Sequence, residues 1–460
     1  MRTYQELFRT PEFRPLFLTS AGQVAAQTVS GLALSTLVYT ATGSPLLSAL
    51  AMFGPALAQV VGATTLLSAA DRLPPRGTLV ALSLLFALGT AATALPGLPV
   101  PAALGIVLGL GAVSALGGGV RYGLLNEVLS KEGYLLGRSA LNMSVGIMQI
   151  LGFATGGLLV ALLSPRGALL TGAALYLATA GVARLGLSRR TPRATGRPSI
   201  GRTWRNNARL WSSPPHRTVY LALWVPNGLV VGCESLYVAY APRHAGILFA
   251  AGAAGMLAGD VLIGRFVPRR LRRRLAVPLL LLLAVPHLVF FLGPSLPLAV
   301  AAVTLATVGY AASLVSQERL MALTPDELSG HALGLHSSGM LTTQGVCAVL
   351  AGAVAERTSP GTGITVLAAA SVAVTLLLAR RLREVPEGPE GPGTPGPGTE
   401  EPGTEERGTA ERGTEERGTE ERGTAGPGTR GPDARGAVAR TRTGDAVTPW
   451  PGGTAGTNTA

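Results

Sequence analysis

The strongest constraint on this chain is a series of apolar runs, each about as long as a helix that crosses a lipid bilayer. A bilayer core accommodates ~20 apolar residues in helical form. Twelve such runs follow one another along the first 379 residues. They occupy residues 16–40, 46–67, 78–95, 101–120, 142–163, 167–187, 218–240, 245–263, 275–293, 297–315, 333–355 and 361–379.

These runs are more apolar than the helices of a soluble protein. Residues 78–95 read TLVALSLLFALGTAATAL and lack the polar face that a soluble helix presents to water. Hydrophobic residues make up 47% of the chain and charged residues 14%, against ~25% charged in soluble domains. Backbone groups in lipid must bond to one another, and no alternating pattern typical of a barrel is visible. The sequence therefore predicts an all-α integral membrane protein with twelve transmembrane helices.

Basic residues are distributed unevenly between the runs. With the amino terminus in the cytoplasm, cytoplasmic segments hold 27 Lys and Arg residues, and external loops hold three, Arg166, Arg243 and Arg357. This bias is the positive-inside pattern. Residues 260–284, DVLIGRFVPRRLRRRLAVPLLLLLA, hold six arginines and are predicted to include the cytoplasmic loop between helices eight and nine. We expect a multi-pass protein of the cell (cytoplasmic) membrane, with both termini cytoplasmic and no removable signal peptide.

An internal repeat divides the membrane part into two halves. Landmark pairs recur at offsets of 189 to 195 residues: Asp71 and Asp260, Gln149 and Gln344, Gly157 and Gly352, and Ser164-Pro165 and Ser359-Pro360. Together they predict two homologous six-helix halves of like orientation, residues 1–187 and 218–383. The segment 188–217 is rich in Arg, Pro and Ser and is interpreted as a cytoplasmic central loop.

Residues 384–460 have a different composition. The stretch GTEERGTAERGTEERGTEERGT (403–424) repeats every five residues and lacks the apolar residues that a core requires. Such a segment is predicted to be a disordered, low-complexity cytoplasmic tail.

Several stretches resemble one transporter family. They are LFRTPEFRPLFLTSAGQ (7–23), LVYTATGSPLLSALAMFGPAL (37–57), VRYGLLNEVLSKEGYLLGRSALNMS (120–144) and LTPDELSGHALGL (323–335). Together with two parallel six-helix repeats, they resemble the major facilitator superfamily. The nearest resemblance is to actinobacterial drug and siderophore exporters related to macrolide-efflux and enterobactin-exporter proteins, and it covers residues 5–383.

This resemblance implies a secondary transporter that exports a drug-like or siderophore-like molecule by alternating access. The stretch ADRLPPRG (70–77) resembles the family's motif after the second helix, but lacks its preceding glycine and has prolines in place of its Gly-Arg part. In the family this loop latches one conformation, so Asp71 and Arg72 are latch candidates. Asp260 and Arg265 are their counterparts in the second half. The alternatives are ordinary loop charge and, for Arg265, a snorkelling anchor at the membrane surface.

Glu234 is the most informative polar residue of the membrane part, because its carboxylate interrupts the seventh apolar run. A carboxylate inside a span costs ~2.5–3.5 kcal/mol on insertion scales, so it is expected to face a cavity or a partner. Proton coupling and recognition of a cationic substrate are the functional interpretations. The structural alternatives for Glu234 are a fixed ion pair and a water-exposed position near the outer surface of the membrane.

Other polar residues inside the runs are candidates for substrate contact or coupling. Relatives commonly carry an acid in the first helix where this chain has Gln27, with Gln23 one turn earlier. An amide bonds to a substrate but carries no proton at physiological pH, which puts the family's proton coupling in doubt unless Glu234 supplies it. The remaining candidates are Asn227, Gln149, Gln344 and Arg121, and the alternatives for them are interhelical hydrogen bonds and, for Arg121, a surface anchor.

Other functional classes find little support in the sequence. We expect no metal site and no cofactor, apart from possible proton coupling, because no ligand cluster, phosphate loop or nucleophile elbow is present. The expected partners are a small-molecule substrate and the lipid bilayer, with no nucleic acid and with a monomeric state. An importer or uniporter of a metabolite, a membrane sensor without transport activity and a membrane enzyme are the remaining alternatives.

Overall fold

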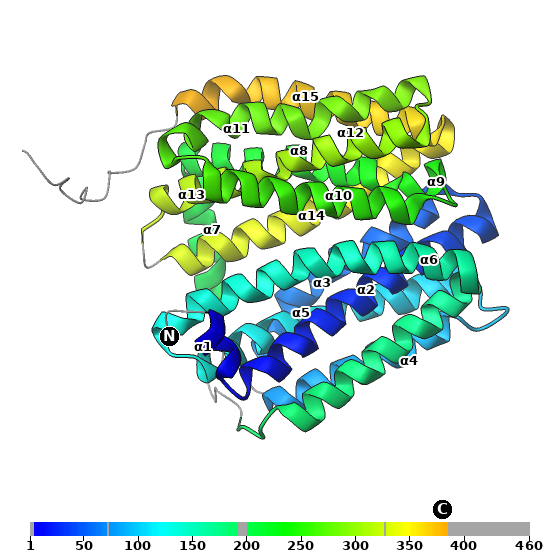
Figure 1. Ribbon diagram of the computed structural model, residues 1–460. Helices are drawn as coiled ribbons and strands as arrows, with labels where there is room; N and C mark the ends of the chain where they lie inside the picture. Colours follow the sequence, from blue (N-terminus) through cyan, green and yellow to red (C-terminus); the bar gives the residue numbers. More distant parts are fainter. Residues whose placement is uncertain (1–3, 71–72, 192–199, 326–327, 385–460) are drawn as a thin grey trace, which may run out of the picture. The chain divides into compact units, whose positions relative to one another are not determined.

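Long helices run side by side through the part of the chain that the computed structural model describes, residues 4–70, 73–191, 200–325 and 328–384 (Figure 1). The first half comprises α1 (Tyr4–Arg9), α2 (Phe13–Thr42), α3 (Pro45–Ala70), α4 (Pro75–Thr93), α5 (Val100–Val128) and α6 (Lys131–Gly186). The predicted latch residues Asp71 and Arg72, and the predicted tail beyond residue 384, lie outside the described residues.

Helix α6 is two membrane crossings joined by a sharp turn. A straight helix of its 56 residues would be on the order of 84 Å long, far more than a bilayer core of ~30 Å. Ser164 breaks it with a φ of 77° and a ψ of 163°, and Pro165 follows. Eleven helical segments of the described chain are long and apolar enough to cross a membrane, and several of them consist of consecutive shorter helices. Because α6 contains two crossings, the total is twelve. The twelve crossings confirm the predicted all-α membrane fold.

The chain after α6 forms shorter pieces, of which α7 lies in the central segment and the others form the second half. They are α7 (Ile200–Ser212), α8 (Pro214–Ser235), α9 (Tyr237–Tyr240), α10 (Ala245–Val261), η1 (Leu262–Phe266), α11 (Arg269–Ala284), η2 (Val285–Leu292), α12 (Leu296–Val308), η3 (Gly309–Ala311), α13 (Ala312–Leu323), α14 (Ser329–Arg357) and α15 (Pro360–Glu384). The 3-10 helix η2 follows the α-helical turns of α11, because Pro286 has no N–H to donate and its ring displaces the carbonyl one turn earlier.

Helix α7 lies inside the segment that the sequence indicated only as a central loop. Its Trp211 stacks on Trp224 of α8, with ring centroids 5.5 Å apart and planes 8° apart. Tyr220 stacks on Trp224 in turn, at 5.0 Å. The linker is therefore anchored to the second half by an aromatic stack.

Arginines join helix ends at one end of the helices, here called the arginine-rich end. Arg190 pairs with Glu12, before α2, at 2.6 Å and with Glu127, in the last turn of α5, at 3.0 Å. In the second half, Arg272 pairs with Glu318 at 2.8 Å and donates to the carbonyl oxygens of Gly264 and Val267. Part of the arginine cluster in residues 260–284 thus caps the carboxyl end of the eighth crossing.

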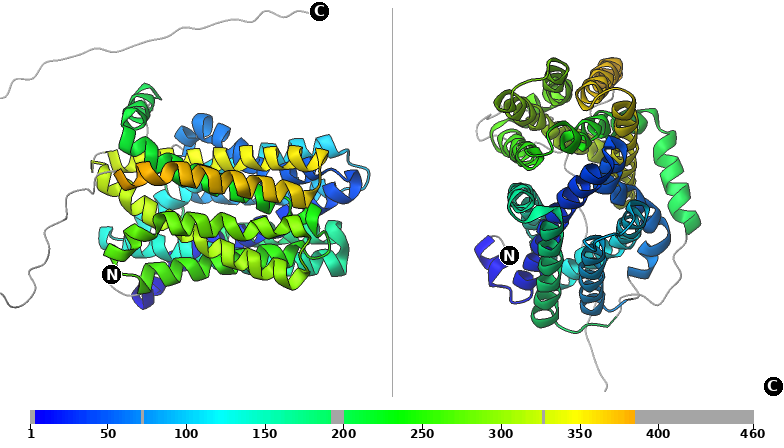
Figure 2. Two further views of the ribbon diagram at one scale, coloured as in Figure 1. Left: turned by 90° about the horizontal axis from the view of Figure 1, so that it is seen from above. Right: turned by 90° about the vertical axis from the view of Figure 1, so that its right-hand side faces the viewer.

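The two halves form two groups when viewed along the helices (Figure 2). They meet closely at the far end, which carries the turns at Gly43, Ser164 and Thr358. An added Cβ on Gly157 of α6 would lie 2.9 Å from the Cα of Gly246 in α10, so only glycine permits this crossing. The repeat places Gly352 of α14 equivalently, and its Cβ would lie 2.6 Å from the Cα of Leu46 in α3.

A carboxylate from the second half also caps a helix of the first half at the far end. Oε2 of Glu356 accepts from the Ser44 hydroxyl at 2.9 Å and from the backbone N–H of Leu46 at 3.3 Å. Both donors lie at the start of α3, where backbone N–H groups lack helical partners and favour a negative charge. The far end is therefore held by tight packing and by a charge-assisted cap.

Replacing Gly352 by valine should open the far end, because the new Cβ would collide with the backbone of Leu46. The measurement is crosslinking of Ser44→Cys to Glu356→Cys by a short bismaleimide, with the two native cysteines replaced by alanine. We expect Gly352→Val to lower the crosslinking yield severalfold. Gly334→Val on the same helix, where an added Cβ meets nothing within 4 Å, is the matched control and should leave the yield unchanged. Equal yields for both variants would contradict the role of the glycine contact.

Candidate functional site

A cavity of about 240 Å³ lies between the two halves and is lined by both. The first half contributes residues from α3 and α6, and the second half contributes residues from α8 to α14. The lining side chains are mostly apolar or aromatic, with a small group of amides, hydroxyls and carboxylates. They belong to Phe53, Gln149, Phe153, Asn227, Val231, Glu234, Tyr237, Phe249, Ala253, Met256, Asp260, Tyr310, Ser313, Met340 and Gln344, with Gly252 beside them.

Glu234 lies in this cavity, one residue before the end of α8. Its Oε1 accepts a hydrogen bond of 2.9 Å from the hydroxyl of Tyr310, in the short segment η3. No described residue forms an ion pair with Glu234, so the fixed ion pair considered from the sequence is not found within the described part of the chain. The carboxyl group has one fixed partner and retains acceptor capacity toward the cavity.

Three amides predicted from the sequence also meet here. Nε2 of Gln344 on α14 donates to Oδ1 of Asn227 on α8 at 2.8 Å. Gln149, the repeat counterpart of Gln344, lines the cavity from α6. Equivalent helices of the two halves thus present equivalent glutamines to one space. The repeat explains why the two glutamines occupy equivalent positions. Each lies eight residues before a glycine, Gly157 or Gly352, at which the halves touch.

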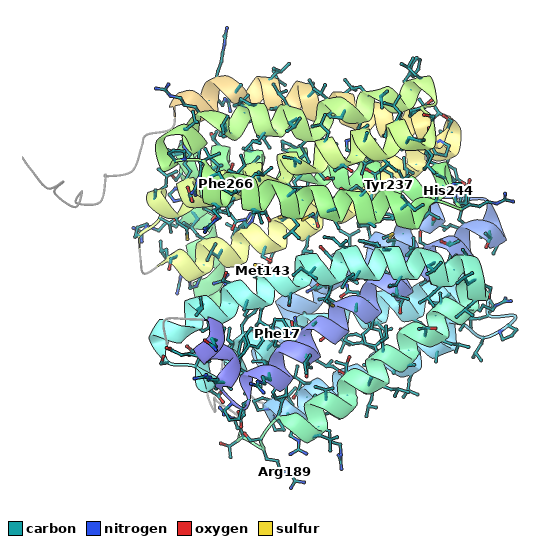
Figure 3. All side chains as sticks on the ribbon, in the orientation of Figure 1. Phe17, Met143, Arg189, Tyr237, His244 and Phe266 are labelled. Carbon is teal, nitrogen blue, oxygen red and sulfur yellow. The ribbon has the colours of Figure 1, made fainter. Side chains whose placement is uncertain are left out.

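Aromatic rings close the cavity toward the far end. Phe153 of the first half stacks on Phe249 of the second, with centroids 4.8 Å apart and planes 20° apart. Tyr237 packs against Phe249 at 5.2 Å. In Figure 3, Tyr237 lies near His244 at the far end, whereas Phe266 lies at the arginine-rich end. The close approach at Gly157 and Gly246 brings the two phenylalanines face to face.

A buried tyrosine–histidine pair supports this aromatic layer, and the sequence analysis did not find it. The Tyr237 hydroxyl lies 2.8 Å from Nε2 of His287, and Nδ1 of His287 lies 3.2 Å from the carbonyl oxygen of Leu283. A carbonyl only accepts, so Nδ1 carries a proton, and in the neutral ring Nε2 accepts from Tyr237. The pair fixes the orientation of the Tyr237 ring. Its members lie 50 residues apart, and neither belongs to a motif that would connect them.

Asp260 contributes a second carboxylate to the cavity. The sequence predicted a latch in which Arg265 could pair with it. Within the described residues no ion pair joins Asp260 to Arg265, which is exposed in η1. The structure thus places Asp260 at the cavity between the halves, and its latch role stays a prediction, as does that of Asp71 and Arg72 outside the described residues.

The remaining candidates lie apart from the cavity lining. Nη2 of Arg121 on α5 donates to Oε1 of Gln23 on α2 at 2.8 Å, within the first half. Gln27 lies one turn further along α2 and is exposed. The structure therefore divides the predicted site into an acidic and amide-rich cavity and a separate Arg121–Gln23 pair. Neither Arg121 nor Gln23 nor Gln27 lines the cavity.

Comparisons with known proteins agree with this architecture. The sequence model of the Major Facilitator Superfamily matches residues 236–414. The fold is similar to that of the nucleoside transporter NupG, with a TM-score of 0.66 and 12% identity, covering 80% of this chain and 99% of that one. A bacterial homolog to the human lysosomal transporter Spinster, inward-facing and unoccupied, gives a TM-score of 0.63 and 14% identity, covering 82% and 97%.

A POT family transporter in complex with 5-aminolevulinic acid is also similar, with a TM-score of 0.65 and 10% identity, covering 81% of this chain and 96% of that one. No curated protein sequence matches the chain. At 10–14% identity, these similarities show a fold shared with membrane transporters. The sequence match to the Major Facilitator Superfamily includes most of the second half, and the similarity in fold extends over both halves.

Removing the Tyr310 hydroxyl should destabilise the protein through Glu234. Tyr310→Phe leaves the carboxyl group without its fixed donor, at a cost of about 1–3 kcal/mol. A double-mutant cycle with Glu234→Gln, read out by thermal unfolding in detergent, should give a coupling free energy on the order of 1 kcal/mol. Tyr122→Phe, at an exposed tyrosine, serves as the control and should show no coupling to Glu234→Gln. Additive effects of Tyr310→Phe and Glu234→Gln would show that the Tyr310 hydroxyl stabilises the carboxyl group no more than it stabilises an amide acceptor.

Proposed function

We propose that this protein is a secondary active transporter that exports a small, amphipathic organic molecule by alternating access. The observation that supports this most directly is the cavity between the halves, lined by both and closed toward the far end by the Phe153–Phe249 stack. Rocking of one half against the other would break that stack and the Glu356 cap, and would expose the same side chains to the opposite side.

We infer the orientation in the membrane and the conformational state of the molecule from the placement of the arginines. Positive charge gathers on the cytoplasmic side of membrane proteins, so the arginine-rich end is assigned to the cytoplasm. The far end then faces the exterior, and the closed Gly157–Gly246 contact belongs to an inward-facing state. Export is proposed from the resemblance to drug and siderophore exporters of this superfamily.

The chemistry of the cavity favours a cationic, drug-like substrate. Two carboxylates, Glu234 and Asp260, lie among five aromatic rings, and no Lys or Arg is among the lining residues of the described chain. Aromatic faces attract cations, and a low-dielectric site strengthens the attraction of a carboxylate for a positive charge. An acidic siderophore would meet two like charges here, so the drug-like class fits the cavity better.

Glu234 is proposed as the proton carrier of this cycle. Among the described residues that line the cavity, it is the only carboxyl group with a hydrogen-bond donor, the hydroxyl of Tyr310. The substrate would approach the same carboxyl oxygen atoms as this hydroxyl. A cation and a proton would therefore compete for it, which is the basis of exchange. The family's acid in the first helix is Gln27 here, and Gln27 cannot replace Glu234 in this role.

Glu234→Gln should abolish uphill transport driven by a pH gradient in proteoliposomes while leaving substrate exchange intact, because an amide neither binds nor releases the proton. Asp260→Asn removes the other carboxylate of the same cavity and is the matched control. It should weaken substrate binding but retain accumulation driven by the pH gradient, because Glu234 still carries the proton. Undiminished uphill transport by Glu234→Gln would refute the assignment. Wild-type equilibration without accumulation would show a uniporter instead.

Substrate charge should decide binding. Benzyltrimethylammonium and its neutral isostere neopentylbenzene have the same shape, so a carboxylate-lined cavity should bind the cation more tightly. We expect the purified protein to prefer the cation on the order of 10-fold, equivalent to ~1.4 kcal/mol, in ligand-induced thermal shifts. The Glu234→Gln/Asp260→Asn variant should lose this preference. Equal affinities in the wild type would exclude a cation-selective site without touching the alternating-access proposal.

A further inference from the structure

A second cavity, of about 550 Å³, lies at the arginine-rich end between the start of α4 and the end of α6. It is separate from the cavity between the two halves, and is formed by α4, the end of α6 and the residues that directly follow α6. Its lining combines four arginines with apolar side chains, and consists of Pro74, Arg76, Gly77, Val80, Ala81, Leu84, Arg184, Arg189 and Arg190. Arg189 lies at the outer edge of the helices in Figure 3.

Three of these four arginines have no partner among the described residues. Arg190 is neutralised by Glu12 and Glu127. Arg76, Arg184 and Arg189 form no ion pair or hydrogen bond with any residue of the described ranges, and the lining contains no carboxylate. Three like charges around one space repel one another, so an anion bound between them would be stabilised.

Apolar side chains continue from these arginines along both helices. On α4, Arg76, Val80, Leu84 and Leu88 follow at intervals of four residues and so share one side of the helix. On α6, Leu170, Leu177 and Arg184 follow at intervals of seven and share a side in the same way. The leucines of both rows are exposed, as expected for side chains that contact lipid. Each row therefore has apolar contacts along the membrane and a cationic group at the membrane surface.

We propose that this groove binds an anionic phospholipid. Its phosphate lies among Arg76, Arg184 and Arg189, where guanidinium groups bond to phosphate oxygens in a bidentate manner. The amino end of α4 lies beside them and adds backbone N–H groups and a favourable dipole. One acyl chain follows Val80, Leu84 and Leu88. A free anion would use only the arginines, so the apolar rows identify a lipid as the occupant.

Basic pockets between transmembrane helices on the cytoplasmic side are a recognised form of lipid site. In this chain the lipid would join the third crossing to the end of the sixth, directly before the segment that leads to the second half. It would hold this corner of the first half together where three cations otherwise repel. The inference does not depend on transport direction, substrate or proton coupling.

The test is lipid binding to the purified full chain, measured by native mass spectrometry and thermal unfolding after addition of phosphatidylglycerol or phosphatidylcholine. We expect phosphatidylglycerol to be retained preferentially and to raise the unfolding temperature. Arg76→Gln/Arg184→Gln/Arg189→Gln should lower its retention at least tenfold. The matched control is Arg274→Gln/Arg380→Gln/Arg381→Gln, which removes the same charge at the same end but outside the groove, and it should bind as the wild type does.

Leu84→Gln separates the lipid from a free anion. It should weaken phosphatidylglycerol binding while leaving the three arginines in place. If the triple arginine variant does not fold, the single variant Arg184→Gln takes its place. Equal phosphatidylglycerol retention by the groove and control variants would overturn the proposal. So would equal stabilisation by inorganic phosphate, which would indicate an anion site, or equal retention of phosphatidylcholine.

Discussion

The close contact between the two halves at the far end determines the rest of the structure. Gly157 and Gly246 let α6 and α10 touch through their backbones, and Gly352 lets α14 touch α3 in the equivalent place. Side chains further along these helices then meet at fixed positions. Phe153 stacks on Phe249 as a consequence, and the central cavity begins beneath them. Larger residues at these crossings would separate the halves, and the cavity would lose its closed end.

The repeat explains why so much of this arrangement was predictable. Duplicated landmarks occupy duplicated positions: Ser164-Pro165 and Ser359-Pro360 both stand at the turn between the fifth and sixth crossings of their half. The glutamines of the same offset both line the cavity. Apolar run lengths predicted the crossings, because lipid leaves the backbone no partner except itself. In α6 the sequence correctly separated two crossings, and the structure divides them at Ser164, whose φ and ψ are not helical.

The parts that sequence reasoning missed depend on contacts between residues far apart in the chain. Tyr310 meets Glu234 across 76 residues, and Tyr237 meets His287 across 50. Neither pair has a spacing that indicates contact, since packing angles between helices decide which faces meet. A tyrosine or histidine inside an apolar run is the signal that was available. Helix α7 was missed although it has an amphipathic pattern of its own, because Ile200, Trp204, Ala208 and Trp211 recur at intervals of three to four residues. Its Trp211 stacks on Trp224 of α8.

Asp260 shows that a motif in the sequence does not by itself decide which groups a residue meets. Its counterpart, Asp71, belongs to a loop motif with Arg72, and this suggested a latch for both. In the second half, however, η1 extends the crossing beyond Asp260 with π-helical turns, and the arginine cluster begins after it. Arg272 is occupied by Glu318 and by carbonyl groups. No cation among the described residues forms an ion pair with Asp260, and Asp260 lines the cavity instead. A carboxylate with no ion-pair partner among the described residues adds negative potential to this cavity, and this agrees with the proposed preference for a cationic substrate.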